Sequence, residues 1–127
     1  MPYQFTKHYT LEEARALLPR VRRWLELLQE SRHKLTRCER KLGYATQPGC
    51  DTGGRLVNAW VRALVETGCL LMEFQQRQIQ IKDLERGLLD FPALINGREV
   101  LLCWEKSEAD IGFWHDLDSG YSGREAL

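Results

Sequence analysis

The sequence has no long hydrophobic run, and this absence excludes one class of protein at the outset. No apolar stretch approaches the roughly 18 residues that a membrane-spanning helix needs. The first eight residues also lack the basic and then apolar layout of a secretory signal peptide. We therefore expect a cytoplasmic protein that does not associate with membranes.

The cysteines are never closely spaced. The four cysteines form no CxxC or CxxxC pair, the spacing that lets two thiols converge on one metal ion or on each other. We expect reduced thiols, with Cys69 and Cys103 buried as small hydrophobic side chains and none of the four in a functional role. The remaining two are Cys38 and Cys50.

Recognisable catalytic and nucleotide-binding motifs are missing too. No serine or cysteine lies in a nucleophile elbow, and the glycine-containing segments 51–55 and 119–124 lack the Lys-Ser/Thr ending of a P-loop. Arg124 could clamp a phosphate in the second segment. We favour a simpler role, in which Arg124 pairs with Asp116 or Asp118 and anchors the C-terminal tail.

The chain has no net charge, but its charges are unevenly spread. Residues 12–41 hold nine basic and five acidic side chains, whereas residues 99–127 hold two basic and seven acidic ones. A basic helix is one feature of nucleic-acid-binding proteins. Because glutamates are interspersed in it, we favour a solvated helix face that pairs with acidic groups within the chain or across a dimer. We do not expect nucleic-acid binding.

The N-terminal third predicts one long helix. Thr10 and Glu13 have the form of a capping box, in which each side chain accepts a hydrogen bond from the other residue's backbone N–H. From Leu11 to Leu42 apolar residues recur at spacings of three and four, which is a heptad seam with two polar slots. Pro19 predicts a kink in this helix, or a division between a short helix and a long one.

A second helix should fold back on the first. The stretch 43–54 contains four glycines and a proline and reads as the loop of a helical hairpin. We then expect a helix at about 55–78 that packs against the first. Its predicted seam is Val57, Trp60, Leu64, Thr67, Leu71 and Phe74.

Beyond Gln78 the pattern changes from helical to alternating. Asn96-Gly97 is a strong signal for a two-residue hairpin turn, because both positions of a type I′ turn need positive φ. It joins strand 88–95, where Pro92 suggests a sheet edge, to strand 99–105. We predict a single α+β domain with a three- to four-stranded antiparallel β-meander. Its parts are the helical hairpin at about 10–78, the meander at about 79–118 and a C-terminal arm at 119–127.

Three segments of the C-terminal half have distinctive sequences: 82–92, 97–104 and 114–124. Together with Phe5-Thr6 and the stretch 12–19, they resemble an uncharacterised prokaryotic family, the domain of unknown function 2203. The resemblance covers nearly the whole chain and implies a bacterial or archaeal cytosolic protein. It implies no activity, substrate or catalytic residue.

The segment 114–118, Trp-His-Asp-Leu-Asp, is the best candidate for a polar site. Alternation along a strand places His115 on the same face as Ile111 and Phe113. We therefore expect a core histidine that is hydrogen-bonded to a carbonyl or a carboxylate.

The same histidine also supports a second hypothesis, a divalent metal site. His115, Asp118 and Asp90 would form a histidine–carboxylate set of the kind that suits iron, zinc or manganese. Arg124 and Asp116 would be contacts for an anionic ligand. No cofactor follows from the sequence beyond such a metal ion.

Two functions remain open on the sequence alone. The first is an interaction or scaffold protein that acts as a homodimer, because the first helix is longer than one meander can cover and Trp24 and Leu27 widen its apolar stripe. That helix could also bind another protein. The alternative is a small-molecule or metal-binding protein, which could be an enzyme. Its site would lie around His115, Asp116, Asp118, Asp90 and Arg124.

Overall fold

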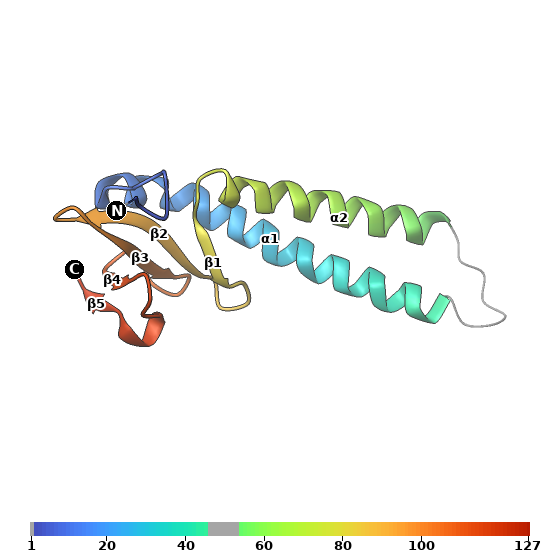
Figure 1. The fold of residues 1–127 in the computed structure, drawn as a ribbon. Helices are drawn as coiled ribbons and strands as arrows, with labels where there is room; N and C mark the ends of the chain where they lie inside the picture. Colours follow the sequence, from blue (N-terminus) through green and yellow to red (C-terminus); the bar gives the residue numbers. More distant parts are fainter. Residues whose placement is uncertain (1, 46–53) are drawn as a thin grey trace. The chain divides into compact units, whose positions relative to one another are not determined.

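The computed structural model describes residues 2–45 and 54–127 and shows two helices followed by an antiparallel sheet (Figure 1). The α+β fold with a helical hairpin and a β-meander is therefore confirmed. Two compact units divide the chain: Met1–Leu25 with Glu73–Leu127, which contains the sheet, and Glu26–Met72, which contains parts of both helices. The elements are α1 (Leu11–Ala45), α2 (Gly54–Gln75), β1 (Gln80–Asp83), β2 (Leu88–Ile95), β3 (Arg98–Glu105), β4 (Phe113–Asp116), the 3₁₀ turn η1 (Tyr121–Gly123) and β5 (Glu125–Ala126).

Helix α1 begins at the predicted capping box. The backbone N–H of Thr10 donates to Glu13 Oε1 and the N–H of Glu13 donates to Thr10 Oγ1, both at 3.0 Å. Pro19 lies inside one continuous helix, so the expected division into two helices is wrong, while the kink stays a prediction. The helix also runs on through Gly43 to Ala45, and the centre of the predicted hairpin loop, 46–53, lies outside the described residues.

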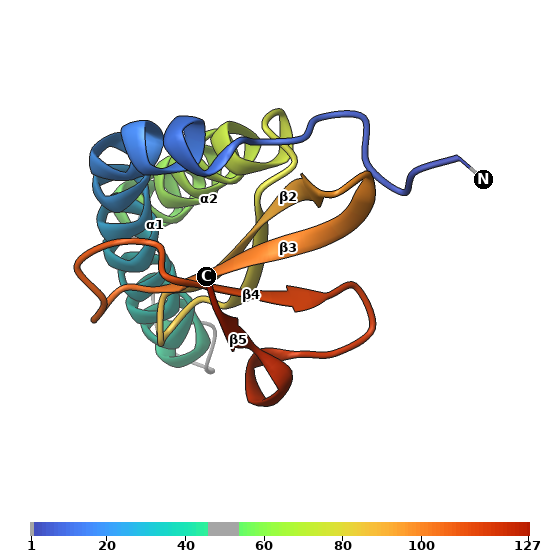
Figure 2. The same cartoon turned by 90° about the vertical axis from the view of Figure 1, so that its left-hand side faces the viewer.

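The sheet has five strands in chain order, β1-β2-β3-β4-β5. This is more than the predicted three to four. Figure 2 shows β2 to β5 following one another across the sheet. The additional pairing is short, since β5 joins β4 only through Ala126 opposite Phe113 and Glu125 opposite Trp114. Two residues in a polar tail carry no alternating pattern, so this strand could not be predicted from the sequence. Asn96 and Gly97 have φ of 52° and 78°, as the predicted turn between β2 and β3 requires.

The prediction that Pro92 marks an edge strand is wrong, because β2 lies between β1 and β3. Pairing with β1 ends at Asp90, opposite Gln80, two residues before the proline. Beyond that point the free edge is used by the N-terminal segment, where the N–H of Tyr9 donates to the Pro92 carbonyl at 2.7 Å. The missing N–H of Pro92 therefore costs no ladder hydrogen bond.

Within the first unit, different segments of the chain pack on the two faces of the sheet. On one face Phe91, Leu102 and Trp104 are at most 2% exposed. The first turns of α1 cover this face, and the Arg22 guanidinium of α1 lies 4.8 Å from the centre of the Trp104 ring. The opposite face carries Asp90 and Cys103, and it is covered by the C-terminal segment. The candidate site lies on that second face.

Basic side chains of α1 are used inside the first unit, as the charge distribution predicted. Arg15 donates two hydrogen bonds to the Ile111 carbonyl, at 3.1 and 2.7 Å, and lies 3.6 Å from an oxygen of Asp110. Arg22 donates to the carbonyls of residues 106, 108 and 109. Trp24 is half-buried against Phe74, with ring centres 6.2 Å apart.

The second unit shows which face of α2 turns toward α1. Ala63 is buried and Thr67 Oγ1 lies 2.7 Å from Ser31 Oγ of α1. The predicted seam of α2 is right in part: Phe74 is buried and Trp60, Thr67 and Leu71 are half-buried, whereas Val57 and Leu64 are wrong, at 37% and 40% exposed. The helix is apolar almost all round, so its periodicity could not decide which face would be buried.

Over the residues that the structure describes, neither helix combines the length and the apolarity that crossing a membrane would require.

Candidate metal centre

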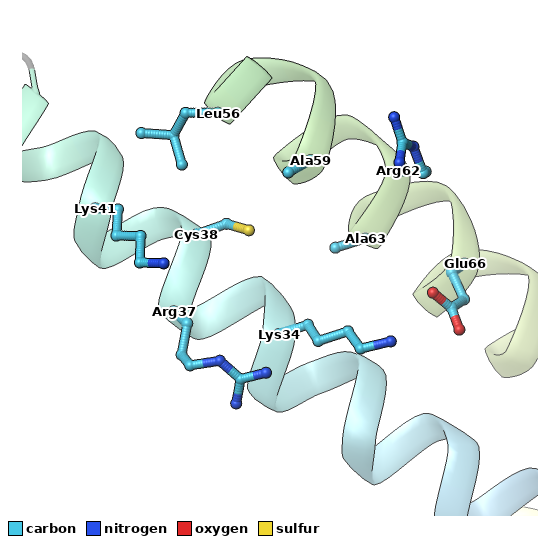
Figure 3. Close-up of a pocket in the computed structure, with 9 residues that line it drawn as sticks. All are labelled: Lys34, Arg37, Cys38, Lys41, Leu56, Ala59, Arg62, Ala63 and Glu66. Atoms are coloured by element: carbon cyan, nitrogen blue, oxygen red, sulfur yellow. The ribbon is translucent and has the colours of Figure 1, made fainter. Parts of the chain in front are cut away.

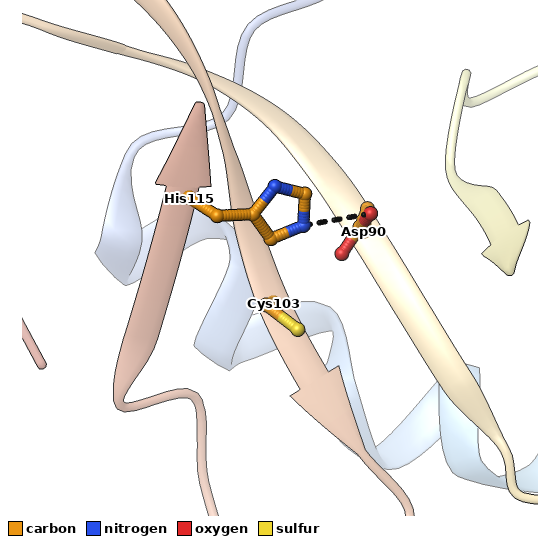
Figure 4. Close-up of side chains that lie close together, drawn as sticks. All are labelled: Asp90, Cys103 and His115. Carbon is orange, nitrogen blue, oxygen red and sulfur yellow. Dashed lines mark hydrogen bonds and ion pairs between the residues drawn. The ribbon is translucent and has the colours of Figure 1, made fainter. Parts of the chain in front are cut away.

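Three side chains from neighbouring strands meet on the second face of the sheet: Asp90 of β2, Cys103 of β3 and His115 of β4 (Figure 4). Asp90 lies directly opposite Cys103, and His115 lies opposite Leu101, which is two residues from Cys103 and therefore on the same face. Their candidate ligand atoms all lie within 4.8 Å of one another. The three residues are 1%, 0% and 3% exposed.

The hydrogen bonds of His115 determine how its ring is protonated. Nδ1 lies 2.7 Å from the carbonyl oxygen of Asp116, which can only accept, so Nδ1 carries a proton. Nε2 lies 3.0 Å from Asp90 Oδ2. This second contact needs one shared proton, either on the carboxyl group or on the ring. Nε2 and Oδ2 therefore hold one proton between them, and a cation could take the place of that proton.

Burial dominates the protonation of the other two groups. Desolvation raises the pKa of Asp90, and attraction to His115 offsets this only in part. Desolvation and the neighbouring Asp90 carboxylate raise the pKa of Cys103 to about 12. Oδ1 of Asp90 is buried and accepts no hydrogen bond from the described residues. Without a cation, Cys103 is a neutral thiol, and its weak S–H donor interacts with the Asp90 carboxylate and favours the charged form of Asp90.

A cavity of about 260 Å³ lies against the cluster. All three cluster residues contribute to its wall, so a small molecule in the cavity would reach them. The rest of the lining comes from β1, β2 and the C-terminal segment, and includes Lys82, Leu88, Leu117, Asp118, Ser119, Gly120 and Tyr121.

The structure brings together two of the three predicted metal ligands. His115 and Asp90 are in contact, whereas Asp118 is exposed and lines the cavity without joining the close cluster. Cys103 takes the third place. No role was predicted for this cysteine, because no cysteine lies close to it in the chain. A signal for it was present, because the predicted two-residue turn at Asn96-Gly97 fixes the register of β2 against β3 and places Cys103 opposite Asp90.

The two predicted anion contacts already have partners. Arg124 makes a two-pronged pair with Glu108, at 3.0 and 2.9 Å, rather than with Asp116 or Asp118. Its guanidinium also lies 3.9 Å from the centre of the Phe113 ring, and Nη1 is 4.0 Å from Cys103 Sγ. Asp116 pairs with Arg98. Arg124 therefore fastens the C-terminal segment over the cluster, in line with the anchoring role but through a different acid.

Nucleophilic catalysis by Cys103 does not fit this geometry. A cysteine nucleophile needs a base within hydrogen-bond reach and a lowered pKa. Both nitrogens of His115 are directed to oxygens, and the pKa of Cys103 is raised. The cluster is better suited to binding a cation, which supplies the missing positive charge.

A second hollow lies between the two helices in the second unit (Figure 3). It has a volume of about 310 Å³, and in Figure 3 Lys34 and Cys38 reach from α1 toward α2. Cys38 is half-buried and Cys69 is exposed, so the prediction that Cys69 is buried is wrong. The lining residues are Lys34, Arg37, Cys38, Lys41, Leu56, Ala59, Arg62, Ala63 and Glu66.

Comparison with known proteins assigns the chain to a family. A family model described as an uncharacterized conserved protein (DUF2203) matches residues 7–127, and the chain therefore belongs to this family. No curated protein matches the chain, and no solved structure does so either.

Proposed function

We propose that this DUF2203 protein binds a divalent zinc ion through Asp90, Cys103 and His115. The observation that carries the proposal is the meeting of a thiol, an imidazole and a carboxylate, all at most 3% exposed, within 4.8 Å of one another. Thiolate and imidazole ligands together favour zinc over magnesium, calcium and manganese, which prefer sites made of oxygen atoms.

Charge balance supports a divalent ion at this place. A thiolate and a carboxylate carry two negative charges, and zinc neutralises both, so the buried centre would be neutral overall. The ion would also replace the proton shared by His115 and Asp90 and would give Asp90 Oδ1 a partner. The bond from His115 Nδ1 to the Asp116 carbonyl is the outer contact that usually orients a histidine ligand.

Three protein ligands leave one of the four zinc positions open. This is the arrangement of catalytic zinc sites, whereas structural sites use four protein ligands. The adjoining cavity offers the access that a water molecule or a substrate atom would need. We therefore infer a zinc-dependent enzyme for a small substrate, in which bound zinc would lower the pKa of a water molecule or polarise a carbonyl.

A thiolate ligand also favours a reducing compartment, because oxidation of Cys103 would remove it. We thus infer a cytoplasmic location. Fractionation of the native host should recover the protein with the cytoplasmic fraction, and recovery from an exported fraction would contradict this location.

Cobalt substitution tests the metal site directly. Purified wild-type protein should bind one cobalt ion and show a sulfur-to-cobalt charge-transfer band, which requires a thiolate ligand. Zinc should displace the cobalt and abolish the band. Zinc at about 100 times its dissociation constant should stabilise the fold by about 2.7 kcal/mol.

Matched variants identify the ligands. Cys103→Ser should abolish the band, whereas Cys69→Ser, which changes an exposed cysteine, should keep it. Asp118 belongs to the ligand set predicted from the sequence but not to the cluster in the structure. Asp118→Asn should therefore leave the metal affinity within a few-fold of the wild-type value. Asp90→Asn should weaken binding by more than the roughly 10- to 100-fold that loss of an outer contact costs. Wild-type protein that binds neither metal would overturn the proposal.

A further inference from the structure

The hollow between the helices of the second unit carries an excess of positive charge (Figure 3). Its volume of about 310 Å³ lies at the lower end of the range for small-molecule sites. Four cationic side chains and one carboxylate line it, so the lining has a net charge of +3. The cations are Lys34, Arg37 and Lys41 of α1 and Arg62 of α2, and the carboxylate is Glu66 of α2. The hollow is therefore electrostatically suited to an anion.

The four cations have no protein partner in the part of the chain that the structure describes. None of their side chains makes a hydrogen bond, an ion pair or a ring contact with another described residue. The basic side chains near the start of α1 differ, because Arg15 lies against Asp110 and Arg22 donates to backbone carbonyls. The predicted pairing of basic residues inside the chain therefore does not account for the cations of this hollow.

Helix stability does not account for these cations either. Lys34, Arg37 and Lys41 follow one another at spacings of three and four along α1, where like charges repel and destabilise a helix. The helix dipole would stabilise cations in the last turn of α1, but that turn contains no basic residue. A bound anion would offset the repulsion and give the cations a partner. The spacing of these charges on one side of α1 therefore favours an anionic ligand.

The floor of the hollow is apolar and is formed by short side chains. In Figure 3 the Cys38 thiol points from α1 toward Ala59 and Ala63 of α2. Larger side chains at the two alanine positions would fill the space, and Leu56 adds an apolar wall. A hydrated inorganic ion would leave this apolar surface in water, whereas the organic part of a larger ligand would cover it. The lining thus suits an anion that carries an apolar group.

We propose that the hollow binds a small organic phosphate ester, with its phosphate among the cations and its organic part on the apolar floor. A phosphate monoester carries close to two negative charges at pH 7 and has three acceptor oxygens. Lysine ammonium groups donate to such oxygens singly, and arginine guanidinium groups donate in pairs. A carboxylate has one charge and two oxygens, so it matches the lining less well. The hollow lies in the second unit and the proposed zinc site in the first, so neither proposal depends on the other.

Fluorescence titration of the metal-free full chain with naphthyl phosphate tests the proposal. This probe joins a phosphate to a flat apolar group, and metal-free protein is used because zinc would itself attract phosphate. The wild type should bind one equivalent with a dissociation constant between about 10 μM and 1 mM. Neutral naphthol should bind about 10-fold more weakly or worse, because it lacks the charged group. Cys103→Ser should leave the affinity for naphthyl phosphate unchanged, which separates this hollow from the zinc site.

Charge variants locate the phosphate. Lys34→Gln and Arg62→Gln each remove one cation and should each weaken the binding of naphthyl phosphate by about 10-fold or more. Arg32→Gln is the matched control and should leave the affinity unchanged. Arg32 is an exposed cation of α1 that lies outside the hollow, roughly 200° around the helix from Lys34. Glu66→Gln removes the one repelling charge and should tighten binding. All four side chains are exposed, so circular dichroism should show the wild-type fold for every variant.

A steric variant tests the apolar floor. Ala59→Leu should weaken the binding of naphthyl phosphate and leave the affinity for inorganic phosphate unchanged, because only the organic part needs the space. Wild-type protein that shows no saturable binding below about 1 mM would overturn the proposal, as would an equal loss of affinity in Arg32→Gln and Lys34→Gln. Tighter binding to phosphatidic acid vesicles or to single-stranded RNA than to naphthyl phosphate would also overturn it, since the occupant would then be a lipid surface or a nucleic acid.

Discussion

His115 Nε2 lies 3.0 Å from Asp90 Oδ2, and this pair is at most 3% exposed on both sides. Removing one member of such a pair leaves the other buried without its partner. We expect His115→Leu to cost about 3 kcal/mol of unfolding free energy in the presence of a chelator. Replacing both residues with leucine should cost less than the sum of the two single changes, because no uncompensated group then remains. Urea denaturation measures the unfolding free energy of the two single variants and of the double variant. If the losses of the two single variants add up to the loss of the double variant, the two residues do not interact.

The capping box predicts a measurable contribution to α1. Thr10→Ala removes the acceptor for the Glu13 N–H and should destabilise the protein by about 1 kcal/mol. Thr36→Ala is the control, since the Thr36 hydroxyl donates back to the Arg32 carbonyl inside the helix and such bonds contribute little. Thermal unfolding of both variants compares the two sites. Equal effects would mean that the cap does not stabilise the helix.

Glu99 gives the protein an acid-sensitive contact. It accepts hydrogen bonds from His8 Nε2 at 2.6 Å and from the backbone N–H groups of Gln4 and Phe5. Desolvation raises the pKa of Glu99, but the bonds from His8, Phe5 and Gln4 outweigh it and hold the pKa below the ordinary 4.5.

Because the folded pKa is lowered, the stabilisation from Glu99 is present above the ordinary value and is lost as the pH falls through the folded value. Hydrogen exchange of the amides of Gln4 and Phe5 should therefore accelerate below about pH 4.5 relative to the sheet core. Glu99→Gln should show the fast exchange already at pH 7. If the Gln4 and Phe5 amides exchange as slowly in this variant as in the wild type, Glu99 does not hold the N-terminal segment in place.

Gly87 and Gly97 both have positive φ, of 71° and 78°, but their surroundings differ. A Cβ at Gly87 would lie 2.7 Å from Lys106 Cβ and 3.0 Å from a methyl of Leu25, whereas a Cβ at Gly97 meets nothing within 4 Å. Gly97→Ala should therefore cost only the roughly 1–2 kcal/mol of left-handed backbone strain. Gly87→Ala should cost clearly more, because the neighbouring atoms must also move. Chemical denaturation compares the two, and equal losses would show that the surroundings relax freely.

Local signals in the sequence determined much of the fold. Thr10 and Glu13 predict the start of α1, and Asn96-Gly97 predicts the turn between β2 and β3. Both the capping box and the turn depend only on residues a few positions apart. The buried run Val100–Trp104 likewise predicted a central strand. Such features follow from capping chemistry, backbone sterics and periodicity, so they could be recognised without a partner segment.

Tertiary structure decided what depends on distant partners. The sequence named Asp90 and His115 as site candidates, but only strand pairing placed Cys103 between them and left Asp118 outside the close cluster. In the same way α2 is apolar on most sides, and only its packing in the second unit showed that Ala63 is buried while Leu64 faces outward. The turn at Asn96-Gly97 encodes the register of β2 against β3. The pairing of β4 with β3 and the rotation of α2 about its axis depend on distant partners, so no short stretch of sequence encodes them.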